Sequence, residues 1–198
     1  MQTRRLALTT PAFLAVLTLL VLYCAATRAA TPAQAWRIDE AHTSIGFKID
    51  ALGFPTTHGY FNRYSGRILI DFEHPAKSFT SFTVDSASVD LGSQYFNDFV
   101  RSRVLLNVEN FPTLSFTSIQ AEKVDPRTAR VTGNLTMLGV SKPITLTVRV
   151  DPDPTANGRV ALVATGTIRR SDFGMIFGIP VIDDALEITV KTRALANG

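Results

Sequence analysis

Three residues close together in the sequence, Asp39, His42 and Ser44, have the acid, base and nucleophile side chains of a hydrolytic triad. In a working triad the base reaches the nucleophile through a hydrogen bond, and the acid orients the base. On an extended strand His42 and Ser44 would share a face, but no glycine-flanked nucleophile turn or oxyanion-hole motif accompanies them. We therefore predict that the protein is not an enzyme and that His42 is a structural hydrogen-bonding residue beside Asp39.

The histidines are the next candidates for chemistry, as metal ligands. His42, His58 and His74 are separated by equal intervals of sixteen residues. Metal sites need three or four converging ligands, usually with a pair at short spacing, and these intervals supply no such pair. Cys24, the single cysteine, lies in an apolar N-terminal stretch. We predict no metal, no cofactor and no disulfide.

Charged residues gather in two further segments, one around Asp98 and Arg101 and one around Arg170 and Asp172. Asp98 and Arg101 are three residues apart and can pair on a helix, whereas Arg170 and Asp172 would share one face of a strand. Two interpretations stay open. The groups form salt bridges that seat a helix on the fold, or an arginine contacts the polar head of a ligand.

The N-terminal stretch has the features of an export signal. Two arginines precede a nearly continuous apolar run over residues 6–26, and Ala-Gln-Ala at 33–35 fits a small-residue cleavage site. We predict a signal peptide over 1–35, cleavage before Trp36 with a site near Ala30 as second choice, and a periplasmic location of the Gram-negative type. The run is about long enough to span a bilayer, so an uncleaved anchor is the alternative. After removal of the signal we expect no stable membrane span.

Charge argues against nucleic acid as a partner. The sequence has 20 Lys plus Arg and 17 Asp plus Glu. Three arginines and no acid lie within 1–35, so the remaining residues have 17 of each and no net charge. A balanced surface does not follow a phosphate backbone. The rest of the chain is long enough for one domain with a substantial core.

Alternation of apolar and polar residues is the main structural signal. It is clearest over Ile144–Val150 and recurs in runs near 45–50, 67–72, 82–88, 114–118, 129–138, 159–170 and 185–194. Turn-forming Gly, Pro, Asn and Asp residues separate the runs. Helical spacing occurs over Ser93–Val104, which predicts one short helix. The sequence therefore predicts an all-β domain of about eight antiparallel strands.

Eight sequential strands leave two exposed sheet edges unless the sheet closes into a barrel. Such a barrel has an interior just wide enough for a small ligand, whereas a two-sheet sandwich would fill its core with side chains. Small residues on the predicted inner faces, Ser86, Ser88, Ser118 and Gly133, would leave room inside. This pattern favours a cavity over a filled core.

Several strings now carry a family resemblance, in order along residues 36–194. They are WRIDEAHTSIGF, GYFNRYSGRILID, NDFVRSRVLLNVENFPTLSFTS, VTGNLTMLGVSKPITLTV and RRSDFGM. With them the chain resembles the YceI-like family of periplasmic, lipocalin-like, polyisoprenoid-binding proteins. Thr43 stands where the family commonly has Ser, and Phe99 stands where it has a basic residue or His after the helix Asp.

The resemblance implies that residues 36–198 form an eight-stranded antiparallel lipocalin-like barrel with one short helix. Its interior would hold a long apolar lipid, a polyisoprenoid, an isoprenoid quinone or a fatty-acyl compound, and no catalytic role is implied. A hydrolase or isomerase acting on such a lipid is one alternative, and a structural β-module with a filled core is another. The sequence leaves a homodimer open.

We predict ligand contacts from four sets of residues. The lumen would be lined by Phe47, Ile49, Phe61, Ile70, Phe82, Val84, Phe116 and Leu135. Phe96 and Phe99 of the helix would close one end, and Phe173, Met175 and Phe177 would supply adaptable apolar contacts. Asp98, Arg101 and Arg170 would lie nearest the head group.

Overall fold

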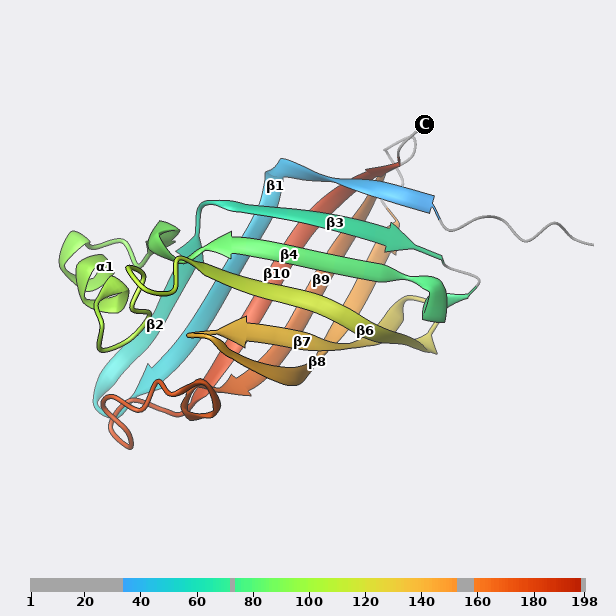
Figure 1. Ribbon diagram of the computed structural model, residues 1–198. Coiled ribbons are helices and arrows are strands. Elements are labelled where there is room, and N and C mark those ends of the chain that lie inside the picture. Colours follow the sequence, from blue (N-terminus) through green and yellow to red (C-terminus); the bar gives the residue numbers. More distant parts are fainter. Residues whose placement is uncertain (1–33, 72–73, 153–158, 197–198) are drawn as a thin grey trace, which may run out of the picture. The chain divides into compact units, whose positions relative to one another are not determined.

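The computed structural model describes residues 34–71, 74–152 and 159–196, and everything below concerns these residues (Figure 1). The predicted signal peptide lies outside them, apart from Gln34 and Ala35. Within this part of the chain no helix is both long and apolar enough to cross a bilayer.

Ten strands and one α-helix make up the described fold. The strands are β1 (Gln34–Ala51), β2 (Phe54–Phe61), β3 (Tyr64–Ile70), β4 (Phe79–Asp85), β5 (Val89–Asp90), β6 (Thr113–Asp125), β7 (Thr128–Met137), β8 (Val140–Pro152), β9 (Arg159–Arg169) and β10 (Ala185–Ala196). The helix α1 spans Gln94–Arg101, and three short 3-10 turns are η1 (Pro75–Lys77), η2 (Ser86–Ser88) and η3 (Arg170–Phe173).

All strand pairs are antiparallel, and eight of the strands form a closed ring. The order around it is β1, β10, β9, β8, β7, β6, β4, β3 and back to β1. β2 and β5 extend the sheet beside β1, which brings the total to ten strands. The structure thus confirms the lipocalin-like antiparallel fold, with two flanking strands that the alternation did not identify.

β1 closes the ring by bending. Its first residues pair with β3, as Trp36 does with Ile68, and its later residues pair with β2, as Phe47 does with Gly59. Along the other edge its pairing with β10 shifts register between Asp39 and Ser44. Extra residues on one strand of a pair bend that strand, which lets β1 serve two neighbours on one side.

The irregular segment of β1 is held in place by hydroxyl groups. The Tyr64 hydroxyl of β3 donates to the Thr43 carbonyl at 2.6 Å. The hydroxyls of Thr43 and Thr192 of β10 lie 2.6 Å apart. Bonds from β3 and β10 therefore fix this segment, which lies within the WRIDEAHTSIGF string.

Two clusters of buried apolar residues line the inside of the ring. The larger one, toward α1, includes Val89, Leu106, Leu114, Phe173 and Met175. The smaller one, which joins the N-terminal part of β1 to β3, β9 and β10, comprises Trp36, Ile38, Ile68, Val160, Leu162 and Ala194. Alternate positions of each strand thus face inward, as the period-two pattern predicts.

Three local predictions need correction. The strand that contains Phe82 and Val84 ends at Asp85, and Ser86 and Ser88 belong to η2 instead of facing the lumen. The Asp85 carboxylate accepts from the Ala87 amide at 2.8 Å and starts this turn. Asp172 lies in η3 and shares no strand face with Arg170. The helix predicted over Ser93–Val104 is present but ends at Arg101.

Candidate functional site

The ring encloses a cavity of about 450 Å³ whose walls are mostly apolar. Every strand of the ring contributes to it: Phe47 and Ile49 from β1, Ile70 from β3, Phe82 and Val84 from β4, Phe116 from β6, Leu135 from β7, Leu146 from β8, Ala164 from β9 and Ile188 from β10. This volume falls in the range of about 300–1,000 Å³ typical of small-molecule pockets. The cavity argues against the alternative of a structural β-module whose core is filled by side chains.

All eight residues predicted for the lumen wall border the cavity: Phe47, Ile49, Phe61, Ile70, Phe82, Val84, Phe116 and Leu135. Phe96, Phe99, Met175 and Arg170 border it as well. Phe173, Phe177, Asp98 and Arg101 do not. Phe173 is 1% exposed in the larger core cluster, and Phe177 packs its ring edge-on against Phe99 with centroids 5.5 Å apart.

Phenylalanine rings on the wall lie over glycines of neighbouring strands. A Cβ at position 59 would fall 2.2 Å from Cζ of Phe47, and one at position 66 would fall 2.7 Å from the Phe82 ring. At Gly133 the corresponding distance to the Phe116 ring is 2.5 Å. Each ring thus occupies the space that a side chain at the glycine would take. The rings lie along the wall, and the centre of the lumen stays open.

Gly133 therefore does not leave room in the way the sequence suggests, because Phe116 occupies the space above it. Ser118 accepts a hydrogen bond from the Thr80 amide at 2.8 Å and is committed to the wall. The small residues Ser118 and Gly133 therefore do not account for the cavity.

The helix α1 covers one end of the cavity with Phe96, Phe99 and Val100. Buried Asn97 ties the helix to the strand before it: its side-chain carbonyl accepts from the Leu91 amide at 2.7 Å, and its amide donates to Asp90 Oδ1 at 3.1 Å. The Gly92 amide and the Asn97 side chain lower the pKa of Asp90, because both donate to its carboxylate. The helix is therefore anchored at its polar face, while Phe96 and Phe99 border the lumen and Tyr95 points to solvent.

Asp98 and Arg101 serve the helix itself. Asp98 is exposed and accepts from Gln94 Nε2 at 2.7 Å. Arg101 Nη1 lies 3.5 Å from Asp98 Oδ1, and its Nη2 donates to the Val89 carbonyl of β5 at 2.9 Å. Exposed ion pairs contribute little, so the bond to the strand backbone is the stronger link. This geometry corresponds to the helix-seating interpretation.

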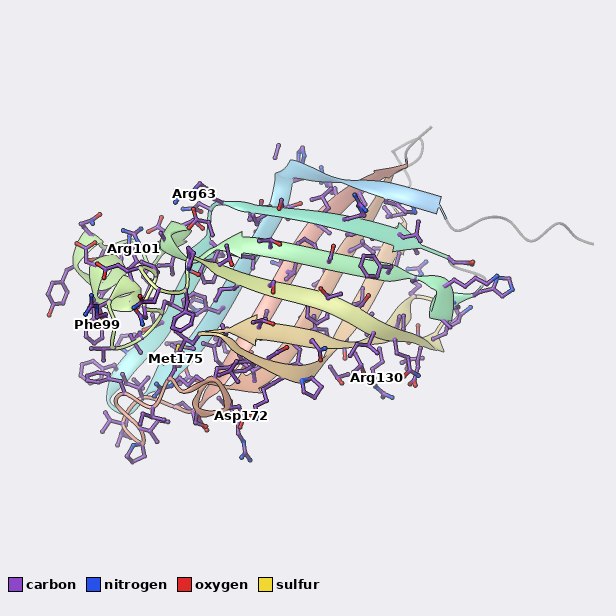
Figure 2. All side chains as sticks on the ribbon, in the orientation of Figure 1. Arg63, Phe99, Arg101, Arg130, Asp172 and Met175 are labelled. Atoms are coloured by element: carbon purple, nitrogen blue, oxygen red, sulfur yellow. The ribbon has the colours of Figure 1, made fainter. Side chains whose placement is uncertain are left out.

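Arg170 organises the loop that follows β9. Its side chain is 2% exposed, and it donates to the carbonyls of Asp183 (2.7 Å), Met175 (3.0 Å), Phe177 (2.7 Å) and Ile182 (2.9 Å). Burial lowers the pKa of the guanidinium. Four bonds to one loop show a structural role that the charge pattern alone did not reveal. Figure 2 shows Met175 from this loop and Phe99 of α1 at the same end of the ring.

The opposite end of the cavity is bordered by polar residues that the sequence did not single out: Asp71, Ser78, Lys123, Asp125 and Arg127. They follow β3 or flank the turn between β6 and β7, at the end away from α1 (Figure 1). The Arg127 amide donates to Asp125 at 2.8 Å and lowers the pKa of that carboxyl. The cavity thus has an apolar middle, an aromatic end and a polar end.

The polar residues considered for chemistry lie apart from this cavity. His42 is exposed on the irregular part of β1, and Ser44 is half-buried opposite Lys191. The side chain of Asp39 lies outside the described part. In the residues that the structure describes, no three His, Cys, Asp or Glu side chains are grouped as metal ligands.

Comparison with known proteins gives a consistent result. The model of the YceI-like domain matches residues 36–194. A UPF0312 protein of Enterobacter sp. (strain 638) is 32% identical over 165 residues, which cover 81% of this chain and 85% of the relative.

Two solved structures share the fold. BcnA of Burkholderia cenocepacia has a TM-score of 0.73 at 24% identity, and covers 79% of this chain and 98% of its own. A domain from Saccharophagus degradans, described as a polyisoprenoid binding domain implicated in plant cell wall breakdown, has a TM-score of 0.65 at 16% identity, with 83% and 99% covered.

Proposed function

The chain belongs to the YceI-like domain family, and on that premise we propose that it is a periplasmic carrier of a long apolar lipid held inside the barrel. The ligand class is a polyisoprenoid, an isoprenoid quinone or a fatty-acyl compound. The protein binds this lipid and performs no chemistry on it. The export signal predicted over residues 1–35 would take the domain to its compartment.

The observation that carries this proposal is the apolar cavity of about 450 Å³. Burying about 500 Å² of lipid tail contributes on the order of 12 kcal/mol at about 25 cal/mol per Å². Loss of ligand motion and chain freedom offsets about half of this or more. The remainder still permits useful binding without a strong polar contact, so a carrier of this kind needs an apolar lumen more than it needs a motif.

The fold shared with the Saccharophagus degradans polyisoprenoid binding domain supports the isoprenoid class. The placement of the polar groups supports binding without catalysis. Arg170 is committed to four loop carbonyls, and His42 lies on the exposed bend of β1.

Solvent extraction of the purified protein followed by mass spectrometry tests the proposal. The full chain is expressed in a host with a periplasm, so that it is exported and folded there, and the purified protein should release a long-chain lipid. Ala164→Phe, which places a ring in the lumen, should lower the amount released at least several-fold. Thr165→Phe is the matched control, because the next residue of β9 faces solvent. Clean extracts from the wild type, or equal release from both variants, would contradict the proposal.

A further inference from the structure

Large apolar side chains are exposed at the end of the barrel that α1 covers. Leu52 and Phe54 at the turn between β1 and β2 are 80% and 70% exposed, and Tyr95 on α1 is 76% exposed. The loop between β9 and β10 adds Ile176, Phe177, Ile179 and Val181, whose exposed fractions range from 39% to 68%. Figure 1 shows these three segments at the same end of the fold. We call this set, together with Phe96, the apolar end.

Direct contacts make the three segments one surface. The Leu52 amide donates to the Val181 carbonyl at 2.8 Å, and Ala51 forms an isolated bridge with Ile182. The Phe99–Phe177 ring contact joins the same loop to α1. The turn, the loop and the helix are therefore held together, and their apolar tips form a fixed patch.

This patch is continuous with the cavity. Phe96 is 54% exposed and also borders the lumen. Ala51 and Ile182, which bridge the turn and the loop, border the lumen as well. An apolar molecule at the apolar end thus has apolar neighbours on the whole path into the barrel.

The composition of the patch indicates what covers it. Residues 52–55 and 174–182 contain no charged side chain and none that forms hydrogen bonds. A protein partner would be met by about one hydrogen bond per 100–200 Å² of interface, whereas the hydrocarbon of a bilayer offers none. Apolar and aromatic side chains that project at one end are the features by which proteins insert shallowly into a bilayer.

Carboxylates lie immediately behind the tips. Asp50 accepts from the Thr56 hydroxyl, and Asp183 accepts from the Ala185 amide at 3.1 Å. Asp172 is exposed on η3 at the same end (Figure 2). With acids behind it, the patch has no excess of positive charge to attract anionic lipids. Its affinity for a bilayer would come from burying its apolar side chains in the hydrocarbon.

We propose that the apolar end is a bilayer-docking surface, through which the lipid passes between membrane and lumen without crossing water. This inference rests on the proposed carrier function. It commits to a lipid bilayer as the partner and to apolar insertion as the force. Binding is therefore expected to need no anionic lipid and not to weaken as salt rises, since screening weakens charge attraction and leaves apolar insertion unchanged.

Flotation with phosphatidylcholine vesicles tests the docking without any ligand. The full chain is expressed and exported, and mass spectrometry confirms the same N-terminus in every variant. Ile176→Asp and Leu52→Asp should each lower the floated fraction about tenfold or more, because an aspartate is costly in hydrocarbon. Ile119→Asp is the matched control, since Ile119 on the β6 wall is 64% exposed and Ile176 is 68% exposed. The control should float like the wild type.

A second measurement separates docking from binding. Radiolabelled polyprenol is delivered either from vesicles or from detergent micelles. The two patch variants should take it up several-fold more slowly from vesicles and equally well from micelles. If neither the wild type nor any variant binds polyprenol from either source, the polyisoprenoid is ruled out as ligand, and flotation still decides the docking.

Three outcomes would overturn the inference. The first is a wild type that floats on no vesicle. The second is a pair of patch variants that float like the wild type. The third is a wild-type dimer in sedimentation that Ile176→Asp dissociates while neither protein floats, which would mean that a second copy covers the apolar end.

Discussion

The ring of Phe47 lies over Gly59, its cross-strand partner on β2, so that a Cβ at position 59 would fall 2.2 Å from the ring. On the outer face of the same strand pair, Tyr60 covers Gly46 in the same manner, with the corresponding distance at 3.1 Å. The two glycines thus hold two aromatic rings on opposite sides of one wall. Of the two aromatic rings, only that of Phe47 borders the cavity.

Gly59→Ala should narrow the lumen, because the atoms it would meet are all at the end of the Phe47 ring, which can move inward. We expect polyprenol binding to weaken about fivefold to tenfold, at a stability cost of about 1–3 kcal/mol for the crowding. Gly46→Ala displaces Tyr60 toward solvent and should leave binding unchanged. Competitive binding with prenols of increasing length checks this. Equal affinities for both variants would show that Phe47 does not set the width.

Arg170→Met should loosen the loop between β9 and β10. It leaves the carbonyls of Met175, Phe177, Ile182 and Asp183 without the donor they share. Unpaired buried polar groups cost about 1–3 kcal/mol each, so we expect a loss of at least about 3 kcal/mol in urea unfolding. Arg169→Met on the exposed neighbour should stay within about 0.5 kcal/mol. Equal losses in both variants would contradict the role of Arg170.

Ser86→Ala should be neutral or stabilising. Ser86 is fully buried, and its hydroxyl has no hydrogen-bond partner among the described residues. Removing a buried hydroxyl of this kind relieves a desolvation cost of about 1 kcal/mol. Ser88→Ala is the contrasting variant, because its hydroxyl donates to the Asp85 carbonyl at 2.7 Å. Thermal unfolding should rank Ser86→Ala above Ser88→Ala, and the reverse order would refute this account.

Low pH should loosen the loop between β9 and β10, because it protonates the Asp184 carboxylate. The amide and hydroxyl of Ser171 donate to its carboxylate at 2.8 and 2.7 Å and lower the pKa of Asp184. A folded-state pKa below the unfolded value stabilises the fold at pH above about 4, and this contribution is lost as pH falls further. Asp184→Asn should lower stability at neutral pH and flatten the acid limb. Hydrogen exchange of residues 171–184 between pH 3 and pH 6 measures the loosening of the loop. A variant with the same pH profile as the wild type would contradict the role of Asp184.

Much of this fold follows from the sequence because period-two alternation is a direct consequence of strand geometry. It placed Phe47, Ile70, Phe116 and Leu135 on the lumen side. It did not locate the end of β4, because Ser86 and Ser88 continue the alternation while the Asp85 carboxylate turns the chain.

The candidate site was harder to anticipate where contacts are distant in sequence. Arg170 reads as a charge available to a ligand, and only the course of residues 175–183 around its guanidinium shows where its donors are directed. The Phe–Gly pairs depend on strand register, and alternation within one strand does not determine which residue of the neighbouring strand lies opposite. The polar end of the cavity brings residues after β3 next to the β6–β7 turn. It could not be predicted without knowing that the strands close into a ring.

The pairing of Trp36 with Ala196 has a consequence for how the protein is made. Closure joins the first strand of the chain to the last, and contacts between residues so far apart in sequence form slowly. During N-to-C synthesis, β1 is made long before its β10 partner. The ring of strands cannot close until β10 has been synthesised, so the edge of β1 that pairs with β10 stays exposed until then.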